Sequence, residues 1–182
     1  MANIILNGKT VVTQTGNDEP LIGGNVVFPA GHVIQVKPFN STAGTDSLTT
    51  SEIAIAASKS NITIKTNNPL IIYVCYLSYE SDLNSSSNMF FSLKYSTDDS
   101  SYNYINSDKR MLGNSVGDAQ GSGSVTFTQY HYLTANENDT IYYQTYFQKS
   151  ITPSIYFNQP SLTGQPTNTD NMCMGYIMEI QQ

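Results

Sequence analysis

Residues 70–77 of this chain are Leu-Ile-Ile-Tyr-Val-Cys-Tyr-Leu and residues 172–180 are Met-Cys-Met-Gly-Tyr-Ile-Met-Glu-Ile, so neither stretch has a polar face. Each has the length and composition of a β-strand. Alternate side chains of a strand point to opposite sides of its sheet. Both sides of the sheet therefore need covering. A second sheet of the same domain can cover one side, and we expect another copy of the protein to cover the other.

The composition favours an all-β domain. Only 12% of the 182 residues are charged, against about 25% in ordinary soluble domains. Polarity comes instead from Ser, Thr, Asn and Gln, and the chain contains 13 Tyr and no Trp. Tyrosine and β-branched residues suit strands, whereas exposed helix faces usually carry Lys and Glu. The length is sufficient for one domain with a sizeable core.

The charge and the apolar runs exclude several classes of partner. The net charge is −6, whereas nucleic-acid binding requires a basic footprint. An anionic membrane surface is disfavoured for the same reason. No apolar run approaches the roughly 20 residues of a membrane helix. The first residues lack the features of a secretory signal. We expect neither nucleic acid nor membrane as a partner.

Short apolar or alternating segments separated by turn residues predict eight or nine strands. No amphipathic helix lies between them, and no repeat is visible. We predict a single antiparallel jelly-roll β-sandwich over residues 28–182. Residues 1–27 are predicted to be an extended anchoring segment with candidate short strands at Ile4–Leu6 and Lys9–Thr13, and a frayed terminus is the alternative. The predicted strands are Val33–Val36, Ile53–Ile55, Asn61–Lys65, Leu70–Leu77, Met89–Tyr95, Ser124–Tyr132, Thr140–Phe147, Ser154–Phe157 and Met172–Ile180.

Two segments are predicted to be long polar loops, Ser96–Gly123 and Asn158–Asn171. Long loops on a rigid sandwich often carry recognition. Equally, such loops can cover sheet edges or subunit seams. The first segment holds the candidate recognition residues, which are aromatic or charged: Tyr102, Tyr104, Asp108, Lys109 and Arg110.

We expect the cysteines, His131 and Glu179 to have structural roles rather than catalytic ones. Cys75 and Cys173 are expected to be buried free thiols, although a bridge becomes possible if their strands are neighbours. His131 is expected to be packed and hydrogen-bonded. Glu179 is expected to be exposed near a strand end, with a buried paired acid as the alternative. We find no phosphate loop, nucleophile elbow or metal-ligand motif, and we predict no cofactor, no metal site and no enzymatic activity.

One ordered set of segments resembles a known family. It runs from Phe28-Pro-Ala-Gly-His-Val-Ile-Gln-Val36 through Ile62-Thr-Ile64, Leu70–Tyr76, Phe90-Phe-Ser-Leu93 and Tyr142-Tyr-Gln-Thr-Tyr146 to Gly175-Tyr-Ile-Met-Glu-Ile180. This order resembles the small virion structural proteins of tailed phages. Those proteins are similar to the trimeric jelly rolls of the tumour-necrosis-factor and complement globular-head type. The leader has no collagen-like or heptad repeat, which favours a short knob or a protein seated directly on the particle over a long fibre.

The resemblance implies a homotrimer displayed on a virion as a head decoration, fibre tip or knob. We expect residues 1–27 to attach it to other virion proteins, and we expect it to be assembled in the host cytoplasm. The alternative function is a receptor- or carbohydrate-binding module of the same fold. The residues predicted at the trimer interface are tyrosines on strands: Tyr73, Tyr76, Tyr142, Tyr146 and Tyr176.

Overall fold

The fold is described from a computed structural model of the chain. It describes residues 2–6, 9–14, 21–22, 30–47, 50–81, 87–105, 111–116, 121–149, 155–157 and 173–182. Strands dominate these residues, and the helical element among them is the short 3-10 turn η1 (Ala56–Ser58). The pairings between strands are antiparallel. The all-β prediction is confirmed.

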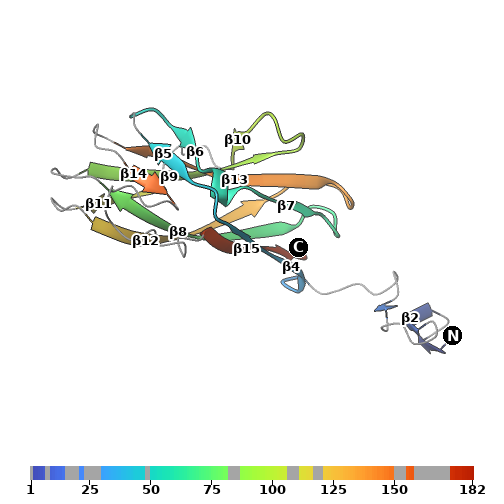
Figure 1. Cartoon of the computed structure of the whole chain (residues 1–182). Helices are drawn as coiled ribbons and strands as arrows, with labels where there is room; N and C mark the ends of the chain where they lie inside the picture. Colours follow the sequence, from blue (N-terminus) through green and yellow to red (C-terminus); the bar gives the residue numbers. More distant parts are fainter. Residues whose placement is uncertain are drawn as a thin grey trace.

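The first sheet of the sandwich contains the two stretches that have no polar face (Figure 1). Its order is β4 (Val33–Ser41), β15 (Cys173–Ile180), β8 (Leu70–Ser81) and β12 (Gly121–Tyr132). Two short strands, β14 (Ile155–Phe157) and β5 (Thr45–Ser47), extend it beside the far end of β8. The two apolar stretches are therefore adjacent strands, and each is covered along both of its edges.

The second sheet is built around two long neighbouring strands, β9 (Ser87–Ser96) and β13 (Thr140–Lys149). Strands β6 (Ile53–Ala54) and β7 (Ser60–Thr63) pair with β13. Strands β10 (Asn103–Tyr104) and β11 (Met111–Val116) pair with β9. This sheet brings together segments that are far apart in the sequence.

The strand orders β4-β15-β8-β12 in the first sheet and β7-β13-β9-β11 in the second resemble those of a jelly roll. The predicted strands Ile53–Ile55, Asn61–Lys65 and Ser154–Phe157 correspond to β6, β7 and β14, whereas the short strands β5, β10 and β11 were not predicted. Strand β4 continues past the predicted Val36 and through Pro38. Proline is accommodated because β4 lies at the edge of the sheet, where a missing N–H costs no ladder bond.

The segment predicted as one long loop over Ser96–Gly123 contains two strands instead, β10 and β11. Strand β11 has the sequence Met-Leu-Gly-Asn-Ser-Val, in which glycine and asparagine mask the strand pattern. Its register against β9 shifts between Met111 and Asn114, which breaks the alternation that sequence analysis relies on. The other predicted loop lies outside the described residues, apart from its flanking strands.

The inward faces of the two sheets meet in an aromatic core. The Phe91 ring lies 5.3 Å from Phe147 and 6.1 Å from Phe157 between centroids, and Phe147 and Phe157 are 4.8 Å apart in an edge-to-face arrangement. Such offset geometries suit the ring quadrupoles. Tyr73 stacks on Phe39 at 5.5 Å and donates its hydroxyl to the Ser58 carbonyl at 2.7 Å. The core is therefore filled by rings from both sheets.

Cys75 and Cys173 are both buried free thiols, as expected from the sequence. Strand pairing brings their sulfur atoms to 3.3 Å. The contact with Cys75 and burial both raise the pKa of the Cys173 thiol well above its usual range. The neutral thiol form is therefore favoured, and the pair behaves as apolar filler between β8 and β15.

Glu179 is fully buried, so the expectation that it is exposed near the strand end is wrong. Its carboxylate accepts bonds from the backbone N–H of Lys65 and Thr66 at 2.9 and 2.8 Å, and from the Thr66 hydroxyl at 2.9 Å. Gln35 Nε2 donates to the same carboxylate and to the Thr63 carbonyl. A charge can be buried when it is hydrogen-bonded in this way. Glu179 thus connects the first sheet to the segment between β7 and β8.

His131 is packed and hydrogen-bonded, as predicted. Its Nδ1 lies 3.0 Å from the Tyr143 hydroxyl, and its ring lies 4.6 Å from the Tyr95 ring. Burial lowers the pKa of His131 from 6.5 to about 4. The imidazole of the folded protein is therefore neutral at pH 5 and above.

We expect His131 to make the protein less stable as the pH falls from about 6.5 to about 4. In this window the unfolded chain binds a proton at the imidazole and the folded chain does not, so acid favours unfolding. The full loss in the free energy of unfolding is on the order of 3 kcal/mol, and this loss levels off below the pKa of His131 in the folded protein. Urea unfolding at several pH values checks this, with His131→Gln as the variant that cannot be protonated. Equal pH slopes for the two proteins would contradict the assignment.

The N-terminal residues form a small sheet of their own, separate from the two sheets of the sandwich (Figure 1). It consists of β1 (Ala2–Leu6), β2 (Lys9–Gln14) and β3 (Leu21–Ile22). The register shifts between Ile4 and Ile5, and both of these side chains are exposed. The short strands expected at Ile4–Leu6 and Lys9–Thr13 are therefore present, and they pair with each other.

Candidate functional site

The outer face of the first sheet is apolar across four strands. The inward residues of β8 and β15, such as Ile71, Cys75 and Ile177, lie in the core, so the alternate residues point outward. Strand register places Met174 opposite Tyr76 and Tyr176 opposite Val74. On the neighbouring strands the outward positions include Val36 and Pro38 of β4 and Tyr130 and Tyr132 of β12. We call this surface, between residues 36–40, 70–76, 126–132 and 174–180, the outer apolar face.

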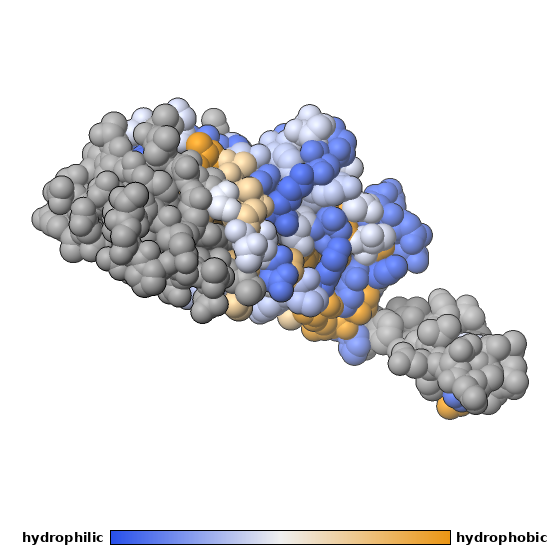
Figure 2. Space-filling view, in the orientation of Figure 1, coloured by the Kyte–Doolittle hydropathy of each residue, from blue (hydrophilic) through white to orange (hydrophobic). Residues whose placement is uncertain are grey.

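Several large side chains of the outer apolar face are open to solvent. Met174 is 49% exposed, Tyr76 39%, Tyr176 36% and Tyr132 74%. Figure 2 shows apolar residues gathered at the lower margin of the sandwich, around β4 and β15. Single exposed apolar residues are ordinary, but a contiguous group of them usually marks a contact surface.

No outward position on this part of the four strands carries a charged side chain. The polar groups available there are Asn40, Thr126, Thr128 and the tyrosine hydroxyls. Protein interfaces are depleted of charge at their centre and enriched in tyrosine and methionine. The outer apolar face therefore has the composition of an interface core.

A hollow of about 650 Å³ lies in this face where β4, β15 and β8 meet. Gly175 lines part of this hollow. A Cβ at this position would collide with the Val74 carbonyl oxygen and would lie only 2.6 Å from the Phe39 ring. The glycine thus lets β15 approach its neighbours closely. The lining is mostly apolar and comprises Pro38, Phe39, Asn40, Val74, Tyr76, Met174, Gly175 and Tyr176.

The structure separates the five tyrosines that were predicted at an interface. Tyr76 and Tyr176 lie on the outer apolar face. Tyr73 is wholly buried inside the sandwich, so its side chain cannot reach a second subunit. Tyr142 and Tyr146 lie on the outer face of the second sheet, because the alternate residues of β13 fill the core. The structure therefore does not bring the five together.

The predicted recognition residues are also divided. Asp108, Lys109 and Arg110 lie outside the described residues. Tyr104 and Tyr102 lie on the outer side of the second sheet. The Tyr104 hydroxyl donates to Glu52 at 2.8 Å, and Lys94 forms an ion pair with Glu52 at 2.6 Å. Burial acts to raise the pKa of Glu52, but hydrogen bonds from Lys94, Tyr104 and Ser92 outweigh it and lower that pKa.

Sequence analysis missed the contributions of Val36, Met174, Tyr130 and Tyr132 to the outer apolar face. The available signal was the absence of charge at every second position of four strands. That signal can be combined into one surface only when the strand order is known.

The described part of the chain contains no helix long and apolar enough to cross a membrane. Among the same residues, no group of three or more His, Cys, Asp or Glu side chains is arranged to hold a metal ion.

Comparison with known proteins finds similarity in three-dimensional structure alone. No family model matches the chain, and no curated protein matches it. Solved structures that are similar include the CBM22-1 xylan-binding domain from Paenibacillus barcinonensis Xyn10C, with 8% identity, a TM-score of 0.34 and coverage of 86% of this chain and 99% of that domain. A chain of infectious bursal disease virus strain Gx has 11% identity and a TM-score of 0.36, with 93% of this chain covering 41% of the viral chain. Similarity at this level concerns the arrangement of strands and does not indicate what this chain binds.

Proposed function

We propose that this chain is a non-enzymatic structural protein of a phage virion whose copies associate through the outer apolar face. The observation that carries the proposal is the absence of charge at the outward positions of four adjacent strands. Leaving this surface in water is unfavourable, so association that covers it is favoured. In the proposed homotrimer, one part of the outer apolar face of each copy contacts a different part of the next copy, and these heterologous contacts close around a threefold axis.

Strand geometry supports this surface as an interface. The long strands β8 and β15 are hydrogen-bonded to neighbours on both edges, so the sheet beneath the face is a rigid platform. Tyr76 and Tyr176 add large rings with few rotatable bonds. Such residues lose little conformational entropy when a partner covers them. This surface is therefore preorganised for contact with a second copy of the protein.

The N-terminal sheet is the proposed attachment to the particle. It pairs within itself rather than with the sandwich, and it exposes Ile4 and Ile5. Exposed isoleucines on a small sheet offer an apolar contact to another virion protein. This division assigns self-association to the sandwich and attachment to residues 1–27.

A carbohydrate- or receptor-binding module is the alternative function. The outer apolar face suits it poorly, because sugar hydroxyls require many hydrogen-bonding partners and this face supplies few. The outer side of the second sheet has a different chemistry, with tyrosines next to paired charges.

Oxidation of Met174 tests the proposed interface. We expect dilute hydrogen peroxide to oxidise Met174 slowly in the wild-type protein, because the neighbouring copy covers a side chain that is 49% exposed in one chain. Peptide mass spectrometry measures the rate. In a variant with a charge at Tyr76, the rate should rise. A wild-type rate equal to that of the variant would refute coverage of this face.

The virion assignment requires a separate test. Purified full-length protein is added to particles that lack it, and bound protein is measured after sedimentation. We expect wild-type protein to bind and the Ile4→Asp/Ile5→Asp variant to bind much more weakly. Trimers that do not bind to the particles would contradict the virion role without contradicting the proposed self-association.

A further inference from the structure

The proposed assembly does not use a band of tyrosines on the outer face of the second sheet. We propose that this tyrosine band, formed by Tyr102, Tyr104 and Tyr146 around Lys94, binds a neutral oligosaccharide. The band lies on the opposite side of the sandwich from the outer apolar face. The two surfaces can therefore be occupied at the same time.

Within the tyrosine band, Tyr104 lies on β10, Tyr146 lies on β13, and Tyr102 directly precedes β10. Lys94 Nζ lies 4.2 Å from the centroid of the Tyr104 ring and 4.0 Å from that of the Tyr146 ring. The Tyr146 ring lies 6.1 Å from the Tyr102 ring between centroids. All three tyrosines are half-buried, so part of each ring faces solvent. A group of neighbouring, partly exposed rings offers several stacking positions to an oligomeric ligand.

Hydrogen bonds hold two of these rings in place. The Tyr104 hydroxyl donates to the Glu52 carboxylate at 2.8 and 2.9 Å, and Ser92 donates to the same group at 2.9 Å. The Tyr102 hydroxyl donates to Asp99 at 2.7 Å. Rings that are fixed before binding lose little entropy on contact with a ligand.

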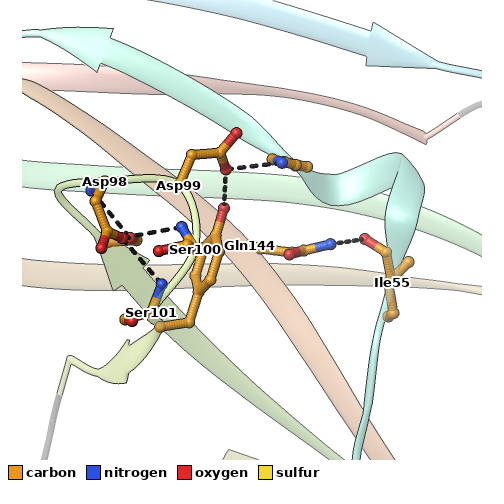
Figure 3. Close-up of polar contacts among 9 residues, drawn as sticks. Ile55, Asp98, Asp99, Ser100, Ser101 and Gln144 are labelled. Carbon is orange, nitrogen blue, oxygen red and sulfur yellow. Dashed lines mark hydrogen bonds and ion pairs between the residues drawn. The ribbon is translucent and has the colours of Figure 1, made fainter.

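The turn that carries Asp99 is itself held in shape. Asp98 accepts hydrogen bonds from the backbone N–H of Ser100 and Ser101, each at 2.9 Å, and from the Ser96 hydroxyl at 2.7 Å. Asp99 adopts a left-handed backbone with φ of 60°. Figure 3 shows Asp99 at this turn, with dashed lines to both of its side-chain partners. The Asp99 carboxylate that holds the Tyr102 ring is therefore itself positioned by a hydrogen-bonded turn.

The charges of the tyrosine band argue for an uncharged ligand. Lys94 is paired with Glu52 at 2.6 Å and Lys59 with Asp99 at 2.7 Å, so these two cations are already neutralised. The chain as a whole carries a net charge of −6. An acidic ligand would meet repulsion and paired cations. A neutral sugar can place its C–H face on the tyrosine rings and its hydroxyls against carboxylates and the exposed Ser100 and Ser101.

Isothermal titration calorimetry on the full-length protein tests this proposal. The probes are neutral oligosaccharides of glucose, xylose, mannose or N-acetylglucosamine, each about six sugars long, and oligogalacturonate as the acidic probe. We expect at least one neutral probe to bind with a Kd of roughly 1 mM or tighter. Tyr146→Ala and Tyr102→Ala should each weaken binding about tenfold. Tyr132→Ala, a tyrosine on the opposite face, should leave the Kd unchanged.

Thermal unfolding of each variant shows whether it is folded. If either Tyr146→Ala or Tyr102→Ala does not fold, the other still tests the proposal. Binding of no neutral probe by the wild-type protein would overturn the proposal. So would tighter binding of oligogalacturonate, or an equal loss in Tyr132→Ala. The assembly-deficient Tyr76→Glu/Met174→Glu variant should retain sugar binding, which separates this proposal from the proposed interface.

Discussion

Replacing Glu179 by alanine is expected to lower the free energy of unfolding by about 3 kcal/mol. The buried carboxylate accepts hydrogen bonds from two backbone N–H groups, those of Lys65 and Thr66, and from the Thr66 hydroxyl and the Gln35 amide. Alanine leaves these donors without their acceptor and opens a cavity beside them. Removing the acceptor from such a buried hydrogen-bond network lowers the free energy of unfolding far more than a surface substitution does.

Denaturant unfolding at neutral pH measures this effect. Glu179→Gln preserves the shape but turns one acceptor oxygen into a donor, so we expect it to fall between wild type and alanine. Glu137→Ala is the matched control, because Glu137 is exposed, and we expect a change within about 0.5 kcal/mol. If Glu179→Ala and Glu137→Ala shift the midpoint equally, the carboxylate does not hold the sandwich together.

A pair of charges on the outer apolar face is expected to weaken self-association at least 100-fold. Tyr76 and Met174 lie directly opposite each other on β8 and β15. Replacing both by glutamate places two adjacent like charges where the partner copy would exclude water. Burial of an unpaired charge at an interface costs several kcal/mol, and about 2.8 kcal/mol already corresponds to 100-fold.

Sedimentation velocity over a range of concentrations measures the association of Tyr76→Glu/Met174→Glu. Tyr142→Glu is the control, since it places one glutamate on the outer face of the second sheet instead. We expect Tyr142→Glu to associate like the wild type. Dissociation caused by Tyr142→Glu, with normal association of the double variant, would move the interface to the second sheet.

Sequence patterns predicted the all-β class and the positions of the long strands because alternation and turn residues are local signals. The apolar stretch Leu70–Leu77 coincides with the first eight residues of β8, and the last apolar stretch coincides with β15. Strand β11 escaped prediction because its glycine, asparagine and register shift interrupt the alternation. Local patterns therefore fail where a strand is irregular.

The same patterns could not decide which tyrosines face outward. Tyr73 and Tyr76 are three residues apart, so they point to opposite sides of β8. Both sides of this strand are apolar, and alternation alone cannot identify the side that is covered by the second sheet. Burial of Tyr73 and exposure of Tyr76 follow from the sheet packing. Glu179 was misjudged for a related reason, because its partners lie more than 100 residues away in the chain.

The tyrosine band depends even more on tertiary structure. Glu52, Lys94 and Tyr104 come from segments separated in sequence and meet through the pairing of β9 with β10 and β13. Tyr102 and Tyr104 were recognisable as aromatic residues in a polar segment. Asp99 is three residues from Tyr102, but Glu52, the partner of Tyr104, is 52 residues away and was not predictable without strand register.

The mass of the wild-type protein in solution tests the central claim most directly. Sedimentation equilibrium or light scattering should give about three times the chain mass of 20.0 kDa, and the mass should persist on dilution into the micromolar range. A mass of 20.0 kDa at every concentration would mean that the outer apolar face remains uncovered, and it would contradict self-association through this face.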